Sequence, residues 1–304
     1  MKKALIIGIY GFAGSYLRQE LEQYYDCYGV DVVSRDDKVE ALDMTDYTQA
    51  ESVISRIKPD LVFNLAGQAS PMISWEKINF TMELNVNLSV NILEACRKHC
   101  PESRILLVGS ANQYDLSQSS EPFVDENIPL VNNSPYAVSK NTQEALVKLY
   151  VKKYGMDVIM TRSFNHIGVG QKVGFVITDY CKRIVDLERG DIETFTYGNL
   201  DSWRDFSDAR DVVKAYRLLA EKGVSGEIYN VGSGKSSYIR DLVGYLVSKS
   251  EKASQVTTLP ERLDDDALVH YAADITKLKN DTGFEPSYDL YSTLDEILES
   301  FRKA

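Results

Sequence analysis

The sequence is poor in the residues that build metal sites and disulfides. Its 304 residues include four cysteines and three histidines. The cysteines form no Cys-X-X-Cys pair. Cys96, His99 and Cys100 share one helical stretch, but three ligands on one turn without a distant fourth make a poor zinc site. We therefore expect no metal. The lack of a disulfide or signal-peptide pattern predicts a reduced, cytoplasmic protein.

Excess positive charge and long apolar runs are also missing. With 34 Lys and Arg against 45 Asp and Glu, the formal net charge is −11, which argues against a nucleic-acid or polybasic membrane-surface binder. No apolar run is long enough to span a bilayer. We see no internal repeat and no low-complexity linker. The length and the 44% hydrophobic content fit one large globular domain or two modest ones.

The N-terminal segment reads as strand, glycine turn and helix. Residues 4–7 form a continuous apolar run, as in a parallel strand buried on both faces. Gly8, Gly11 and Gly14 follow, and then a helical pattern over residues 15–24. Glycines let the backbone approach a pyrophosphate, and the helix N-terminus offers free N–H groups to it. This order predicts a dinucleotide-binding start.

Strands and helices alternate through most of the remaining chain, which predicts a parallel α/β sheet. The fold class is therefore a Rossmann-type, doubly wound parallel sheet with a smaller, interleaved C-terminal substrate-binding portion. We assign residues 1–165, plus roughly 204–235, to the NAD(P)-binding domain, and residues 166–203 and 236–304 to the substrate-binding portion. The further strands are expected at 26–30, 60–67, 105–108, 158–160, 193–197 and 227–234, and the helices at 82–98, from 135 onwards, at 208–222 and at 289–302.

The end of the second strand carries conflicting signals about the cofactor. Asp31 lies roughly twenty residues past the glycines, where an acid accepts hydrogen bonds from the adenosine ribose and repels a 2′-phosphate. Ser34 and Arg35 follow closely and could instead hold that phosphate. We expect NAD(H) to be favoured, with NADP(H) as the alternative. Asp43 and Met44 read as an adenine contact, although a solvated acid and a core methionine would look the same.

A tyrosine and a lysine stand four residues apart at the start of a predicted helix. Pro135 suits the first helical turn, so Tyr136 and Lys140 project from one face about one turn apart. A nearby ammonium is expected to lower the phenol pKa and make the hydroxyl a usable proton donor or acceptor. Ser110 follows the predicted strand 105–108 and lies at the carboxyl edge of the sheet. The pair alone is common on surfaces, and its value comes from this context.

The glycine turn, Ser110, Tyr136 and Lys140 together resemble the extended short-chain dehydrogenase/reductase family over essentially the whole chain. The nucleotide-sugar branch is the sharper match, namely the GDP-mannose 4,6-dehydratases and GDP-4-keto-6-deoxy-mannose reductases. The segments that carry this likeness are 162–168, 170–171, 198–200, 204–208, 210–211 and 229–234.

The resemblance implies a nicotinamide cofactor and the reduction of the C4 ketone of a nucleotide-diphosphate 4-keto-6-deoxyhexose, GDP-linked. Tyr136 would protonate the developing alkoxide, Ser110 would hydrogen-bond the same oxygen, and Lys140 would hold the ribose. Arg204 would clamp the substrate diphosphate, and Asn165 would position the substrate. The resemblance also implies a homodimer that packs the 82–98 and 136–153 helices into a four-helix bundle.

Two departures from that pattern bear on the reaction. Dehydratases of this type carry an acid two residues before the Tyr114 position, whereas residues 110–113 contain no carboxyl group. Reduction is then the natural reading, with a 4-epimerase or 4,6-dehydratase as the alternative and a non-catalytic dinucleotide binder as the least favoured. Near the C-terminus Arg262 is kept, but Asp264 stands where a second arginine is expected, so the nucleotide stays open.

The complete set of expected contacts follows from the fold and the resemblance. The expected cofactor contacts are Gly8, Tyr10, Gly11, Phe12, Ala13, Gly14, Asp31, Arg35, Asp43, Met44, Leu65, Ala66, Gly67, Tyr136 and Lys140. The expected substrate contacts are Gln68, Asn112, Asn165, Val176, Arg204 and Arg262.

Overall fold

A seven-stranded, fully parallel sheet forms the centre of the computed structural model, which describes residues 1–116, 122–198, 200–260 and 271–304. The strand order is β11-β7-β5-β4-β1-β2-β3. This is the doubly wound order, and it confirms the predicted fold class. The strands are β1 Lys3–Ile7, β2 Asp26–Asp31, β3 Val39–Ala41, β4 Leu61–Asn64, β5 Arg104–Val108, β7 Val158–Ser163 and β11 Ile228–Val231.

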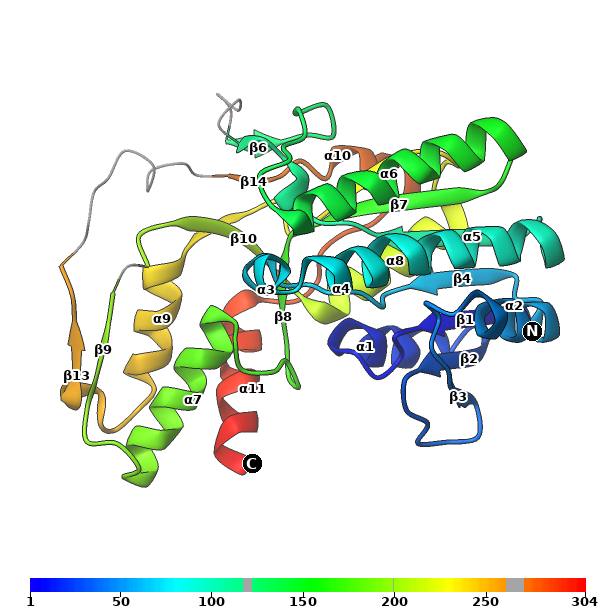
Figure 1. Ribbon diagram of the computed structural model, residues 1–304. Helices are drawn as coiled ribbons and strands as arrows, with labels where there is room; N and C mark the ends of the chain where they lie inside the picture. The colour runs from blue at the N-terminus through cyan, green and yellow to red at the C-terminus, as the bar shows by residue number, and fades with distance from the viewer. Residues whose placement is uncertain (117–121, 199, 261–270) are drawn as a thin grey trace.

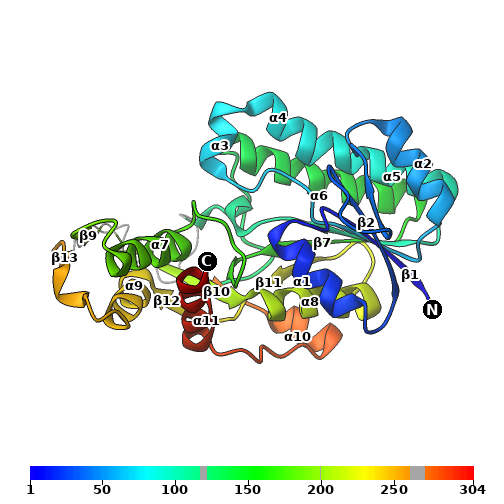
Figure 2. The same ribbon diagram turned by 90° about the horizontal axis from the view of Figure 1, so that it is seen from below.

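Helices cover both faces of this sheet, as Figure 2 shows. Ala4 and Ile6 of β1 point into one apolar cluster, and Leu5 and Ile7 point into the other. Successive side chains of a strand face opposite sides, so a strand buried on both faces must be apolar throughout. One face carries α1 Phe12–Leu21, α8 Ala209–Lys222 and α10 Thr276–Thr282, and the other carries α2 Tyr47–Ile57, α5 Leu88–His99 and α6 Pro135–Tyr154.

The helix expected over residues 82–98 is longer and less regular than predicted. It starts with α4 Ile78–Met82, passes through a π-helical turn over Glu83–Asn87 and continues as α5. A further helix, α3 Pro71–Glu76, precedes it. Such π turns often accompany functional sites. Here the turn places the side chain of Asn85 against the backbone of Gln68, at the carboxyl end of β4.

A smaller portion lies beside the large sheet, on the left of Figure 1, with its own apolar cluster. Its centre is the three-stranded sheet β12-β10-β8, in which β10 is parallel to β8 and antiparallel to β12. The elements of this portion are β8 Asn165–Ile167, α7 Val176–Arg189, β9 Phe195–Tyr197, β10 Trp203–Asp208, β12 Ser236–Tyr238, α9 Ile239–Ser248, β13 Val256–Thr258 and α11 Leu290–Lys303.

The two portions are interleaved along the chain. After β10 in the small sheet, α8 and β11 return to the large layer, and β12 then re-enters the small sheet. Two further short strands, β6 Phe123–Val124 and β14 Ala272–Ala273, pair in parallel. They bring the C-terminal part of the chain alongside the segment that follows β5. Among the described residues, no helix combines the length and apolar character that a bilayer crossing requires.

Candidate active site

The glycine turn is closed by contacts that leave no room for side chains. A Cβ on Gly14 would lie 2.0 Å from the carbonyl oxygen of Gly8. Gly8 itself has φ +82°, and a Cβ there would lie 2.8 Å from the nitrogen of Ala66. Gly11 is the N-cap of α1 and has no side chain to occupy the first free N–H groups. The turn therefore presents Phe12 and Ala13 at a helix N-terminus suited to a phosphate.

The structure brings both candidate ribose-side residues to the glycine turn. The carboxylate of Asp31 accepts hydrogen bonds from the nitrogen of Tyr10 at 3.0 Å and from that of Val32 at 2.8 Å. The guanidinium of Arg35 lies 4.8 Å from the centre of the Tyr10 ring, and the nitrogen of Arg35 donates to the Tyr10 hydroxyl. An acid and a base thus share one edge of the site, so the cofactor preference stays a prediction.

Two other expected adenine-side residues have structural roles. Asp43 accepts hydrogen bonds from the nitrogen and the hydroxyl of Thr45, ahead of α2. Met44 is buried in the apolar cluster on the α2 face. Both match the alternative reading of a turn acid and a core methionine, and their contact with adenine stays a prediction.

The carboxyl end of β4 leads into a segment that lies directly against the glycine turn, since a Cβ on Gly8 would come within 2.8 Å of the Ala66 nitrogen. Leu65 and Ala66 are partly buried against opposite faces of the sheet. A Cβ on Gly67 would meet the side-chain oxygen of Asn85 at 2.7 Å, so the backbone passes directly over the π turn. The side-chain amide of Gln68 donates to the carbonyl of Ser70 and accepts from the backbone nitrogen of Ser70.

Ser110, Tyr136 and Lys140 come together at the carboxyl end of β5. Tyr136 and Lys140 are 5% and 6% exposed. The Lys140 Nζ donates to the carbonyl of Val108 at 2.8 Å and lies 5.9 Å from the centre of the Tyr136 ring. The Ser110 hydroxyl interacts with the Tyr136 hydroxyl and accepts from the nitrogen of Asn112 at 3.2 Å. The grouping of a hydroxyl, a phenol and an ammonium can deliver a proton to one oxygen.

The expected lowering of the pKa of Tyr136 is wrong, because the net shift is upward. Burial raises the pKa of Tyr136, and the hydrogen bond with Ser110 offsets only part of that rise. Burial also lowers the pKa of Lys140 to about 8. The reason is that both groups lose water, and desolvation disfavours the charged form of each. Tyr136 is therefore a protonated phenol at neutral pH.

The residues expected on the substrate side are spread over several elements. Asn165 is exposed on β8, and Val176 is half-buried at the first position of α7. Asn112 is exposed, and its side-chain amide lies 3.4 Å from the Ser110 hydroxyl. Arg262 and the neighbouring Asp264 lie outside the described residues.

Arg204 is half-buried on β10 and held from two sides. Its guanidinium donates to the carbonyl of Trp203 at 2.7 Å and lies 5.2 Å from the centre of the Tyr271 ring. The next residue, Asp205, is buried and accepts hydrogen bonds from the nitrogens of Ser233, Gly234 and Ala273. The strand that carries Arg204 is thereby tied to the loop after β11.

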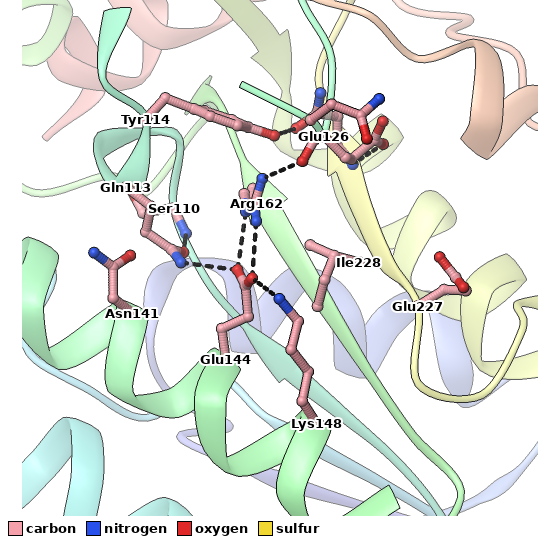
Figure 3. A network of polar contacts seen from close by, with 12 residues as sticks. Ser110, Gln113, Tyr114, Glu126, Asn141, Glu144, Lys148, Arg162, Glu227 and Ile228 are labelled. Carbon is pink, nitrogen blue, oxygen red and sulfur yellow. Dashed lines mark hydrogen bonds and ion pairs between the residues drawn. The ribbon is translucent and has the colours of Figure 1, made fainter. Parts of the chain in front are cut away.

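Residues that no motif had singled out support the site from behind. The side chain of Gln113 accepts from the nitrogen of Ser110 and donates to Glu144, and Glu144 is paired with Arg162, as Figure 3 shows. The signal for Glu144 was its place four residues after Lys140, on the same helical face. Asn85 gave no such signal, because its importance depends on the π turn.

The comparison with family models decides the family. Residues 4–232 match the model of the NAD dependent epimerase/dehydratase family. The chain belongs to this family. The matched residues span the large sheet from β1 to β11. They include the glycine turn and the group formed by Ser110, Tyr136 and Lys140. It confirms the predicted family and the prediction of an NAD(P)-dependent enzyme.

Curated relatives and solved structures agree with this assignment. The chain is 28% identical to the GDP-6-deoxy-D-mannose reductase of Pseudomonas aeruginosa, over 99% of this chain and 97% of that protein. It is 26% identical to the GDP-mannose 4,6-dehydratase of Yersinia enterocolitica, over 90% and 78%.

Two solved structures superpose over nearly the whole chain. A structure of RMD from Pseudomonas aeruginosa complexed with NADPH has a TM-score of 0.86 at 26% identity, covering 100% of this chain and 99% of that one. A UDP-glucose 4-epimerase of Thermotoga maritima with UDP-glucose has a TM-score of 0.85 at 26% identity, covering 99% of each. The chain thus stands among nucleotide-sugar reductases, dehydratases and epimerases.

Proposed function

We propose that this protein uses NAD(P)H to reduce the C4 ketone of a GDP-linked 4-keto-6-deoxyhexose. The similarity to a GDP-6-deoxy-D-mannose reductase over 99% of this chain and 97% of that protein supports the substrate class. The dehydratase relative matches only 78% of its own length.

The observation that carries the proposal is a buried, protonated Tyr136 next to Ser110. The bound cofactor would supply a hydride to the carbonyl carbon. Ser110 would hydrogen-bond the carbonyl oxygen, and Tyr136 would release its phenolic proton to that oxygen as negative charge develops. Lys140, whose pKa is lowered to about 8 by burial, would stabilise the phenolate that remains. A phenol that holds its proton at neutral pH suits reduction, because the carbonyl oxygen must gain a proton as the hydride is added to the carbon.

The segment after β5 supports reduction over dehydration. Removal of water from a sugar needs an acid/base group beside the Tyr114 position, and residues 110–113 offer a serine, an alanine, an asparagine and a glutamine. The side chain of Asn112 is turned toward the Ser110 hydroxyl instead. A side-chain amide does not act as an acid or a base near neutral pH, so the dehydratase reaction is the weaker proposal.

For the cofactor we propose a preference for NADH, with NADPH as the alternative. Asp31 supports NADH, because a carboxylate repels a 2′-phosphate. Arg35 on the ring of Tyr10 and the NADPH bound to the similar Pseudomonas aeruginosa structure support NADPH. The ratio of kcat/KM for the two cofactors decides between them.

The proposed reaction is tested by incubating the purified protein with NADH or NADPH and a panel of nucleotide-diphosphate 4-keto sugars. Oxidation of the cofactor together with a product two mass units heavier supports reduction. Conversion of a 4-hydroxy sugar into its C4 epimer without net cofactor oxidation would replace the proposal by an epimerase. Cofactor binding without conversion of any sugar would leave the non-catalytic reading.

We also propose a cytoplasmic homodimer. Four free cysteines suit a reducing compartment. Exposed apolar side chains on α3, α4 and α6, among them Trp75, Phe80 and Leu149, favour pairing of these helices with a second copy. Sedimentation equilibrium of the wild type and of Leu149→Glu tests this arrangement. A monomeric wild type would refute it.

A further inference from the structure

A buried ion pair lies behind the candidate catalytic groups, on the side of α6 that faces the sheet. Glu144 and Arg162 are 2% and 4% exposed in their side chains. Arg162 donates to Glu144 through Nε at 3.0 Å and through Nη2 at 2.8 Å. Burial alone would raise the pKa of Glu144, but Arg162 and then Lys148 outweigh it and lower the pKa. The pair is thus ionised, and every oxygen of Glu144 is in use.

Glu144 reaches Ser110 through one side chain. The Oε2 atom of Glu144 accepts from the Nε2 of Gln113 at 3.2 Å. The other end of the same amide, Oε1, accepts from the backbone nitrogen of Ser110 at 2.9 Å. Because the carboxylate can only accept, the NH₂ group of Gln113 must face Glu144 and its oxygen must face Ser110. The carboxylate therefore sets the orientation of the amide that holds Ser110.

Arg162 extends the same network to other elements. Its Nη1 donates to the carbonyl of Glu126 at 2.9 Å, and the side chain of Glu126 accepts from the nitrogen of Asn230 on β11 at 2.8 Å. The guanidinium also lies 4.7 Å from the centre of the Tyr114 ring. Figure 3 shows these groups gathered around Arg162. The segment after β5 is thus held between α6, β7 and β11.

We propose that Glu144, acting through Gln113, is a positioning residue that holds the Ser110 hydroxyl opposite Tyr136. Glu144 lies two helical turns after Tyr136 on α6, so one helix carries both the phenol and the group that orients its partner. The functional part of this inference rests on the proposed reductase activity. The positional part rests on the geometry alone.

The first test substitutes Glu144→Gln. A glutamine offers one oxygen where the carboxylate offers two, so Arg162 and Gln113 compete for it. If Gln113 turns its amide to match, it presents an NH₂ group to the N–H of Ser110, and that hydrogen bond is lost. Amide hydrogen exchange at Ser110, followed by NMR, should quicken by about tenfold. Unchanged exchange at Ser110 would overturn the inference.

Two further variants isolate the link. Gln113→Met leaves the ion pair in place and removes only the connecting amide, so it should quicken exchange at Ser110 as Glu144→Gln does. It decides the question alone if Glu144→Gln does not fold. Lys148→Met is the matched control, because Lys148 also binds Glu144, at 2.8 Å, but is 60% exposed and does not touch Gln113. In Lys148→Met, the rate of amide hydrogen exchange at Ser110 should equal that of the wild type.

Kinetics test the functional part. A misplaced Ser110 should lower kcat by about ten- to a hundredfold in Glu144→Gln and Gln113→Met, with the KM for the cofactor unchanged. In a Ser110→Ala background the same substitutions should add less than about a twofold loss. Equal losses in both backgrounds would mean a merely structural role and would overturn the positioning. A wild type that reduces no sugar would instead refute the proposed function, and the exchange measurements would still decide the positioning.

Discussion

The candidate residues lie in two places that differ in burial, namely the carboxyl edge of the large sheet and the small β12-β10-β8 sheet. At the large sheet, Tyr136 and Lys140 are nearly fully buried, and burial alters both of their pKa values. On the small sheet, Asn165 is exposed and Arg204 is half-buried. Desolvation strengthens electrostatic interactions at the edge of the large sheet, whereas the exposed residues of the small sheet are open to a large ligand. We infer that the buried edge controls the chemistry and the small sheet controls which substrate binds.

The largest expected effect is the loss of chemistry without loss of binding. Tyr136→Phe removes the only proton that the buried phenol can donate, so kcat should fall by about a hundredfold or more while cofactor affinity persists. Steady-state turnover and a cofactor-binding titration measure the two quantities. Tyr150→Phe, farther along the same helix, is the control and should keep its turnover. Near-normal turnover of Tyr136→Phe would remove Tyr136 from the mechanism.

The reverse result is expected on the small sheet. Arg204→Ala should raise the KM for a nucleotide sugar strongly, because a charged contact to a diphosphate contributes about 2–5 kcal/mol. Cofactor affinity should not change. Arg183→Ala is a suitable control, since Arg183 also stacks on a tyrosine, at 5.2 Å from the Tyr180 ring, but is exposed on α7. An unchanged kcat/KM in Arg204→Ala would separate the reductase chemistry from the nucleotide-sugar assignment.

The burial of Lys140 should appear in the pH dependence of stability. Its folded pKa is lowered to about 8 from the ordinary lysine value of 10.5, so the unfolded chain binds more protons than the folded protein between these two pH values. Stability then rises with pH across that window, and the wild type should gain up to about 3 kcal/mol relative to Lys140→Met. Urea unfolding of both proteins at several pH values measures the difference. Parallel curves would mean that Lys140 is not desolvated in the folded protein.

The smallest effect concerns the choice of cofactor. Asp31→Ala removes the carboxylate that would repel a 2′-phosphate, so the ratio of kcat/KM for NADPH over NADH should rise by about tenfold. Asp37→Ala changes an exposed acid in the same loop and should leave the ratio alone. A wild-type preference for NADPH that does not change in Asp31→Ala would assign the selection to Arg35.

Local sequence patterns predicted most of the large sheet, because its central strands carry continuous apolar runs at residues 4–7, 61–63 and 105–108. The spacing of Tyr136 and Lys140 was enough to place them on one face of α6. The helix expected over residues 82–98 begins instead at Ile78 and contains a π turn. Local patterns do not describe this turn or the contact that it allows between Asn85 and the backbone of Gln68, which lies 17 residues earlier.

The sequence by itself determined the order of strands and helices, the glycine turn, and the identity of the phenol, the ammonium and the hydroxyl. Each depends on neighbours within a few residues, which periodicity and spacing describe. Tertiary structure alone decided that Tyr136 holds its proton more tightly than a free tyrosine and that Glu144 reaches Ser110 through Gln113. Both depend on burial and contacts between segments far apart in the chain. Desolvation raises the pKa of Tyr136 although Lys140 lies one helical turn away. It acts only once those segments have packed.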